Sequence, residues 1–366
     1  MLGKTSLYLK DFDWFIFLLA LIIAFVGVVE IHSATHYDRS ENFYLKQVYR
    51  ILIGLVLMVL AMSVDYHTIA ENVPYLYVAG ILSLASVLFL GRTKSGGGKS
   101  WISLGGFFEV QPSELVKVIV VLALARYLCE IRTEYLSGKE ILKASAIFGF
   151  PVLLVIIQPD LGSAITFFPI LMAGLILGGL RPKWVIGAVI LSVLVVALGW
   201  YNLKVYQKER IYTFLEPERD PQGTGYHSIQ SKIAFGSGGF WGKGIGKGSQ
   251  TRLGFLPERH TDFIFSVVGE ELGFVGAGTL LILYLLIVMR SIHVAQTARD
   301  KLGIYIAVGG TSVLLFHILE NMGMVVGLMP ITGIPLPLLS YGGSAILSTF
   351  IFLGLIINVR MRRYVN

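Results

Sequence analysis

The chain has 366 residues, of which 55% are apolar and only 14% are charged. Because soluble domains carry about 25% charged residues, the composition excludes an ordinary soluble protein, and it also excludes a disordered or fibrous chain. The net charge is +7, but no stretch interleaves basic and aromatic residues on a polar surface, so an anionic lipid or phosphate is a better partner than nucleic acid. The single cysteine, Cys129, excludes an internal disulfide and a cysteine-based zinc site.

Apolar segments recur along the chain at lengths that suit membrane spans, which need about 20 residues as helices. The sequence predicts an all-α integral membrane protein with about ten transmembrane helices in a single polytopic domain, residues 1–366. We read the first segment as an uncleaved anchor, and Pro159 separates the fifth from the sixth, which predicts a helical hairpin. The segments are 14–31, 48–64, 73–90, 113–129, 144–157, 161–180, 184–200, 263–289, 303–329 and 341–359.

The basic residues decide the expected orientation. A raw count does not separate the two sides of the membrane, because the long loop at 201–262 is itself basic, but long loops cross largely regardless of their charge. The short connections on the side of both termini are rich in Lys and Arg. We therefore expect a multi-pass membrane protein with both termini cytoplasmic and the 201–262 loop extracytoplasmic, between the seventh and eighth helices.

The long loop carries two patterns of its own. Residues 205–215 and 226–235 have the apolar spacing of helices, which predicts short helices lying on the membrane surface. Residues 236–248 are rich in glycine, which predicts a flexible, backbone-dominated loop that can approach a ligand closely.

Asp262 stands at the end of this loop, directly before an apolar run. One interpretation is a helix N-terminal charge, which stabilises a helix by about 0.3–1 kcal/mol. The other is a general base or metal ligand for a substrate at the outer membrane surface. Position alone leaves both open.

Further ionisable residues lie within or beside the predicted spans. Glu114 and Lys117 are three residues apart and share a helix face, where they form either an internal ion pair or the wall of an aqueous cavity. Asp160 is equally consistent with an N-cap and with a cavity role. His317 and Glu320 have the spacing of a buried hydrogen-bonded pair, and a metal site would need a third ligand. Trp101 is either an interfacial anchor or a platform for a sugar.

Five blocks of sequence, in this order, resemble the SEDS family (shape, elongation, division and sporulation), and the details are closer to its rod-shape branch than to its division branch. The third block consists of Tyr226 and His227 together with residues 230–234, and the fourth block contains Asp262. The blocks are 99–102 with 111–117, 158–162, 226–234, 255–265 and 334–344. The resemblance covers nearly the whole chain.

The resemblance implies a peptidoglycan glycosyltransferase of the bacterial cytoplasmic (inner) membrane. It would polymerise lipid II, a disaccharide peptide linked to undecaprenyl pyrophosphate, for cell elongation and rod shape. It implies a class B penicillin-binding protein as the transpeptidase partner, together with other membrane proteins of the elongation complex. The catalytic aspartate of the family falls on Asp262 and its outer-loop tryptophan on Trp101. Glu114, Lys117 and Asp160 fall on positions of its central cavity.

This chemistry needs a base and cations. The 4-hydroxyl of one lipid-linked sugar attacks the anomeric carbon of another and expels a lipid pyrophosphate; Asp262 supplies the base. Cations assist the departure of the pyrophosphate. The sequence does not identify a cofactor, although a divalent ion, Mg²⁺ or Mn²⁺, fits this role. The candidate cationic side chains are Lys117, Arg210, Arg252 and Arg259.

Two other functions stay open at this point. A lipid II flippase would explain ionisable groups within spans, and a non-catalytic scaffold of the elongation machinery would need no carboxylate at Asp262.

Overall fold

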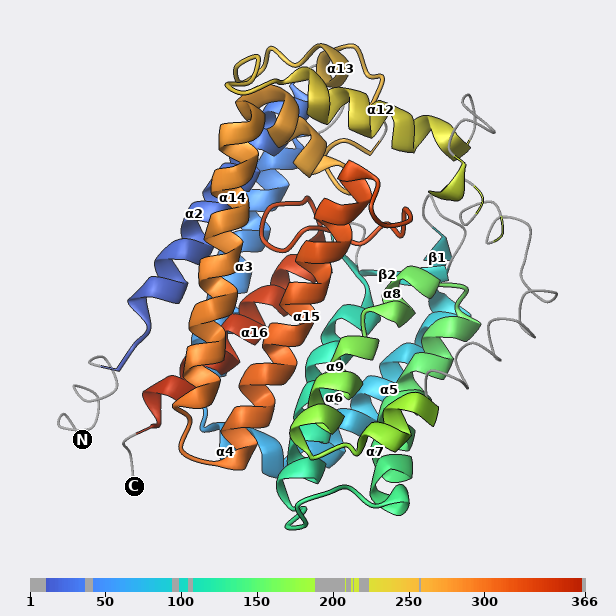
Figure 1. The fold of residues 1–366 in the computed structure, drawn as a ribbon, viewed down its shortest axis with the longest axis vertical. Helices are drawn as coiled ribbons and strands as arrows, with labels where there is room; N and C mark the ends of the chain where they lie inside the picture. The colour runs from blue at the N-terminus through green and yellow to red at the C-terminus, as the bar shows by residue number, and fades with distance from the viewer. Residues whose placement is uncertain are drawn as a thin grey trace.

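The structure, a computed structural model, describes residues 11–36, 42–93, 99–104, 108–187, 208, 212, 214–216, 224–256 and 258–363. Long helices lie side by side and form most of it (Figure 1). The helices are α2 (Trp14–Thr35), α3 (Phe43–Ser63), α4 (Tyr66–Glu71), α5 (Val73–Leu90), α6 (Pro112–Cys129), α7 (Gly138–Ile157), α8 (Leu161–Ile165), α9 (Phe168–Leu177), α12 (Thr224–Ser237), α13 (Ser249–Arg252), α14 (Ile264–Gln296), α15 (Lys301–Val326) and α16 (Gly343–Met361).

The helices confirm the prediction of an all-α membrane protein. Among the described residues, α2, α3, α5, α7, α14, α15 and α16 are long and apolar enough to span a bilayer. Helix α6 is 18 residues long but carries three ionisable residues, and α8 with α9 forms a shorter apolar unit, Leu161–Leu177. Most of the predicted segment 184–200 lies outside the described residues, as do most of the predicted 205–215 helix and Arg210.

The buried part of the bundle is at its centre. Helices α15 and α16 are mostly buried, whereas α3, α5 and α7 keep broad apolar faces exposed at the periphery. Helix α16 packs against α3, α6, α14 and α15. In a bilayer the peripheral faces contact lipid, so the central helices are the place where polar side chains are enclosed by protein.

Two predicted spans are interrupted. The continuous helix expected at 161–180 is wrong, because α8 ends at Ile165 and α9 begins at Phe168 with a proline in its first turn. Proline lacks the N–H of a helix interior but fits a first turn. In α14, Gly273 has φ +66° and ψ −164°, which divides the helix into two straight pieces.

The glycine-rich loop 236–248 fills this break. Lys243 N donates to Glu270 O at 3.0 Å, and Gly244 N donates to Glu271 O at 2.9 Å. In return, Phe274 N donates to the main chain of the loop at Gly239 O, 2.9 Å away. The loop thus pairs main-chain groups that the kink leaves without helical partners.

A small antiparallel sheet was not expected from the sequence. Strands β1 (Arg92–Thr93), β2 (Lys99–Leu104) and β3 (Phe108–Val110) pair in that order and lie against α5, α6 and α16. The strands are short and carry no clear alternation of apolar and polar residues, which is the pattern that predicts a strand.

Candidate functional site

The two ends of the bundle are named here by their short helices: the α12 end also bears α13 and the sheet, and the α4 end is opposite (Figure 1). The segment 327–342 connects α15 to α16 at the α12 end. It contains three prolines and is not helical. Irregular backbone is tolerated at membrane depth where protein encloses it, and here Leu338 and Leu339 are buried.

Side chains and main-chain groups from distant helices hold the 327–342 segment. Gln47 on α3 donates to Ser340 O at 3.0 Å, and the Tyr284 hydroxyl on α14 donates to Pro337 O at 2.5 Å. Tyr341 N donates to His260 O at 2.9 Å. The last contact joins the segment to the turn that contains Asp262.

Asp262 lies in the turn that precedes α14. The helix begins at Ile264 with Phe263 as its N-cap, so Asp262 does not occupy the N-cap position. Its main-chain oxygen accepts a hydrogen bond from Asn321 at 2.9 Å. A Cβ atom placed on Gly333 would lie 3.4 Å from Asp262 Oδ2, so the carboxylate lies directly beside the 327–342 segment.

Glu114 and Lys117 form a buried ion pair in the first turns of α6. Lys117 Nζ lies 2.8 Å from Glu114 Oε1, and the two side chains are 0% and 5% exposed. Ser348 donates to the other carboxylate oxygen at 2.9 Å. Such additional hydrogen bonds are what a buried pair needs to offset its desolvation. The geometry agrees with the ion-pair interpretation of the spacing.

His317 on α15 extends this pair toward the 327–342 segment. Its Nε2 lies 3.0 Å from Lys117 Nζ, and its Nδ1 lies 3.4 Å from Pro335 O. Because an ammonium group only donates, Nε2 accepts and the proton of a neutral imidazole is assigned to Nδ1. The predicted pair of His317 with Glu320 is wrong, since Glu320 instead accepts from Thr332 at 2.8 Å.

Asp160 borders the same segment from the other side. Its side chain caps α8 by accepting from Ser163 N at 3.0 Å, and Gln111 donates to it at 2.9 Å. A Cβ atom on Gly162 would lie 2.5 Å from Thr332 O. The N-cap role is therefore present, and it coexists with a place at the edge of the cluster.

The structure thus gathers Asp262, Glu114 with Lys117, and Asp160 around residues 332–335. Other predicted site residues lie elsewhere. Trp101 is in β2, opposite Arg92 of β1, Arg252 is exposed on α13, and Arg259 Nε donates to Ala34 O at the end of α2 at 2.6 Å.

Asn321 and Gln111 belong to the cluster, although sequence reasoning assigned neither a role. The only signal for Asn321 was a strongly polar residue within an apolar span. Gln111 directly precedes Pro112 at the start of α6, and its side chain bridges to Asp160.

His227 on α12 stacks on Phe263, with ring centroids 6.4 Å apart and planes 4° from parallel. Burial lowers the pKa of His227, and Glu258 opposes this in part. At neutral pH the imidazole is therefore mainly uncharged beside the turn that carries Asp262.

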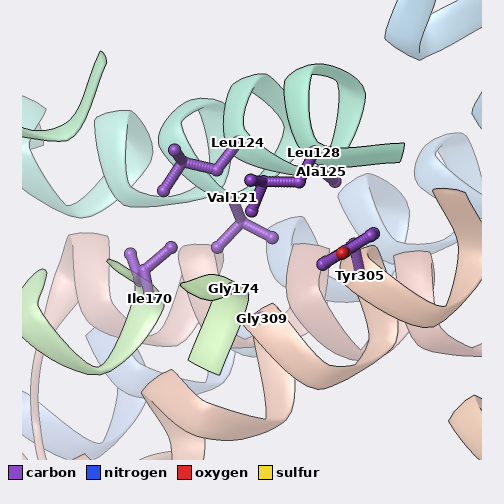
Figure 2. Close-up of a pocket in the computed structure, with 8 residues that line it drawn as sticks. All are labelled: Val121, Leu124, Ala125, Leu128, Ile170, Gly174, Tyr305 and Gly309. Carbon is purple, nitrogen blue, oxygen red and sulfur yellow. The ribbon is translucent and has the colours of Figure 1, made fainter. Parts of the chain in front are cut away.

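A small apolar cavity lies apart from this cluster, between α6, α9 and α15 (Figure 2). Its volume is about 10 Å³, the space of roughly one water molecule. Tyr305 is its single polar side chain, and the other lining residues are Val121, Leu124, Ala125, Leu128, Ile170, Gly174 and Gly309. It does not overlap the residues gathered around 332–335.

The part of the chain that the structure describes contains no group of three His, Cys, Asp or Glu side chains spaced to hold a metal ion.

Comparisons with known proteins agree over nearly the full length. The family model described as cell cycle protein, for FtsW, RodA and SpoVE, matches residues 12–365. The peptidoglycan glycosyltransferase MrdB of Escherichia coli (strain K12) is 39% identical over 348 residues, which cover 94% of this chain and 92% of that protein.

Two solved structures superpose on the described fold. One belongs to a study of how a peptidoglycan synthase complex coordinates polymerization and crosslinking; its TM-score is 0.83 at 32% identity, covering 97% of this chain and 99% of that chain. The other is the rod shape determining protein RodA of Thermus thermophilus, with a TM-score of 0.72 at 29% identity, covering 97% of this chain and 98% of that chain.

Proposed function

The chain belongs to the SEDS family, the cell cycle proteins FtsW, RodA and SpoVE, and we propose that it polymerises lipid II with Asp262 as the catalytic base. It is a peptidoglycan glycosyltransferase, as its relative MrdB is named. Its likeness to a rod shape determining protein supports a role in cell elongation.

One observation supports the assignment to Asp262. Three groups of ionisable side chains that are far apart in the sequence approach residues 332–335. Asp262 lies beside Gly333, Lys117 is linked to Pro335 O through His317, and Asp160 caps α8, whose Gly162 lies against Thr332 O. Of these side chains, Glu114 and Lys117 are enclosed by protein, whereas Asp160 and Asp262 are half-buried; enclosed charges in a membrane protein are costly unless they are paired or serve a site. Among them Asp262 is in the turn that enters α14, where a lipid-linked sugar can reach from the membrane surface.

In the proposed step, the carboxylate of Asp262 accepts the proton of the sugar 4-hydroxyl as that oxygen bonds to the anomeric carbon of the second sugar. The bond from that carbon to the pyrophosphate breaks, and the electron pair leaves with the phosphate oxygen. Lys117, Arg252, Arg259 and Arg210 stay the predicted cationic partners of the pyrophosphate. Among them Lys117 lies in the cluster, paired with Glu114, Arg252 and Arg259 lie away from it, and Arg210 lies outside the described residues.

We also propose that the α12 end faces the outside and the α4 end the cytoplasm. Basic residues at the α4 end include Arg290, Arg299 and Arg360, which fits the excess of basic residues in short cytoplasmic connections. A class B penicillin-binding protein is the proposed transpeptidase partner. The similarity to a chain of a complex that joins polymerization and crosslinking supports this choice.

The test is polymerisation of purified lipid II by the purified protein, with glycan chains resolved by length on a gel. Asp262→Asn keeps the size of the side chain and removes the base, so the rate should fall about 10²- to 10⁴-fold. Retained thermal stability and retained partner binding serve as controls. A well-assembled Asp262→Asn protein with full activity would contradict the proposal and favour the flippase or the scaffold.

A further inference from the structure

Helix α15 presents three polar side chains on one face near its end at the 327–342 segment. His317, Glu320 and Asn321 have the spacing i, i+3 and i+4, which aligns side chains along a helix. Each contacts a different residue of the segment: His317 lies near Pro335 O, Glu320 binds Thr332, and Asn321 binds Ile334 O. One rigid helix therefore fixes residues 332–335.

Asn321 differs from its neighbours because it also holds the turn that contains Asp262. Its Nδ2 donates one hydrogen bond to Ile334 O at 2.8 Å and another to Asp262 O at 2.9 Å. The side chain is 0% exposed. A primary amide has two N–H groups on one nitrogen, so it can join two main-chain carbonyls that a hydroxyl, with one hydrogen, cannot.

The two carbonyls belong to the two pieces of backbone that define the place of the Asp262 carboxylate. One is the main chain of Asp262 itself, and the other follows Gly333, on which an added Cβ atom would lie 3.4 Å from Asp262 Oδ2. Gly333 has φ +76°, a conformation that side-chain-bearing residues rarely adopt. If the two pieces separate, the carboxylate moves relative to the surface that it faces.

We propose that Asn321 is a positioning residue for Asp262: it holds the turn of the catalytic carboxylate against the 332–335 backbone at the distance that the reaction needs. This inference rests on the proposed function of Asp262. Asn321 touches no reacting atom and acts through the main chain. Its removal should therefore lower the rate of the chemical step and leave the binding of lipid II largely intact.

The chain contains a matched control at the α4 end. Asn358 on α16 is also 0% exposed, and its Nδ2 also donates to two main-chain carbonyls, those of Ala61 and Val64. It joins α16 to the end of α3 and contacts none of the residues around Asp262. A substitution there removes the same two amide donations, together with the hydrogen bond that Arg362 donates to Asn358 Oδ1, from a place that the proposed reaction does not use.

The experiment measures initial rates of lipid II polymerisation over a range of lipid II concentrations, together with thermal unfolding, for Asn321→Leu and Asn358→Leu. Misplacement of a catalytic group by about 1 Å costs up to about 100-fold in rate, so Asn321→Leu should lower kcat about 10- to 100-fold with KM within about threefold. Asn358→Leu should lower the melting temperature about as much as Asn321→Leu does, but it should leave kcat within about twofold of the natural value.

A second variant keeps the test decisive if Asn321→Leu does not assemble. Asn321→Gln retains the amide but displaces its nitrogen by one methylene, so kcat should fall less than in Asn321→Leu, with the melting temperature near that of the natural protein. Natural kcat in Asn321→Gln and in any assembled Asn321→Leu protein would overturn the inference. So would an equal fall of kcat in Asn358→Leu, because the effect would then come from stability alone.

The outcome is separable from that of the proposed function. If Asp262→Asn is inactive while the Asn321 variants keep the natural kcat, Asp262 remains the base and only the positioning role fails. If Asp262→Asn is fully active, the proposed function fails whatever the Asn321 variants do.

Discussion

The two ends of the bundle carry their charged groups in different ways. At the α4 end, Asp13 is 1% exposed and pairs with Arg290 and Arg360, whose side chains are each 28% exposed and reach solvent. At the α12 end of the core, Lys117 and Glu114 are enclosed on all sides. Exposed pairs stabilise a protein weakly, whereas enclosed pairs are costly to desolvate. The comparison teaches that the ion pair with both partners enclosed lies in the cluster around residues 332–335, whereas the pairs of Asp13 keep one partner in contact with solvent.

The same contrast holds for His67, which is half exposed at the α4 end. Its two ring nitrogens lie 3.0 Å from Asp65 and 2.6 Å from Asp300, and it joins the start of α4 to the start of α15. His317 at the α12 end is instead buried between a lysine and a main-chain carbonyl. The first histidine connects helix ends, and the second belongs to the cluster around residues 332–335.

The comparison assumes that the two ends lie on opposite sides of the membrane, and cysteine labelling tests this assumption directly. In a Cys129→Ser background, Ser237→Cys lies at the α12 end and Glu134→Cys at the α4 end, and both positions are exposed. A membrane-impermeant maleimide applied to spheroplasts should label the first and not the second. Labelling of Glu134→Cys alone would invert the proposed orientation.

The next largest effect separates enclosed from exposed pairs. Lys117→Met leaves the Glu114 carboxylate buried without its cation and should destabilise the protein by about 3–5 kcal/mol. His67→Gln at the α4 end should cost only about 0.2–1 kcal/mol. Thermal or denaturant unfolding of the purified proteins compares them.

The double variant Glu114→Gln with Lys117→Met removes both charges and should recover much of the lost stability. If the two single variants, Lys117→Met and His67→Gln, were equally stable, the distinction between the two ends would not hold.

A smaller effect distinguishes the two pieces of α14. Gly273→Ala should destabilise the protein by at least about 1–3 kcal/mol, because φ is +66° and the new Cβ would lie 2.3 Å from Gly242 N. Gly278→Ala, five residues further along the same helix, meets no atom within 4 Å and should be neutral or stabilising by up to about 1 kcal/mol. The measurement is the unfolding midpoint of each variant. Equal midpoints would show that the backbone at the Gly273 kink does not require glycine.

Local patterns predicted much of the fold. The span at Val73–Leu90 agrees at both ends with the predicted segment, because its apolar run is bounded by a polar residue before and a glycine after. The ion pair of Glu114 with Lys117 and the capping by Asp160 were also predictable, since both depend on residues three apart in one helix.

Features that depend on distant partners were not predictable. The acceptors of Asn321 are main-chain carbonyls at Asp262 and Ile334, which carry no side-chain signature. The kink at Gly273 looks like an ordinary glycine within an apolar span until the loop at 236–248 is placed against it. His317 and Glu320 were matched to each other by spacing, but both have partners elsewhere in the chain.

The loop at 236–248 has the composition of a flexible linker, yet its main chain supplies the hydrogen bonds at the break in α14. Gly238 and Gly242 are so close to α14 that a Cβ atom on either would overlap its carbonyl oxygens. Its length is therefore set by the helix that it serves: an inserted or deleted residue would shift several donors and acceptors at once. The low sequence complexity of residues 236–248 therefore encodes a segment that fits closely against α14.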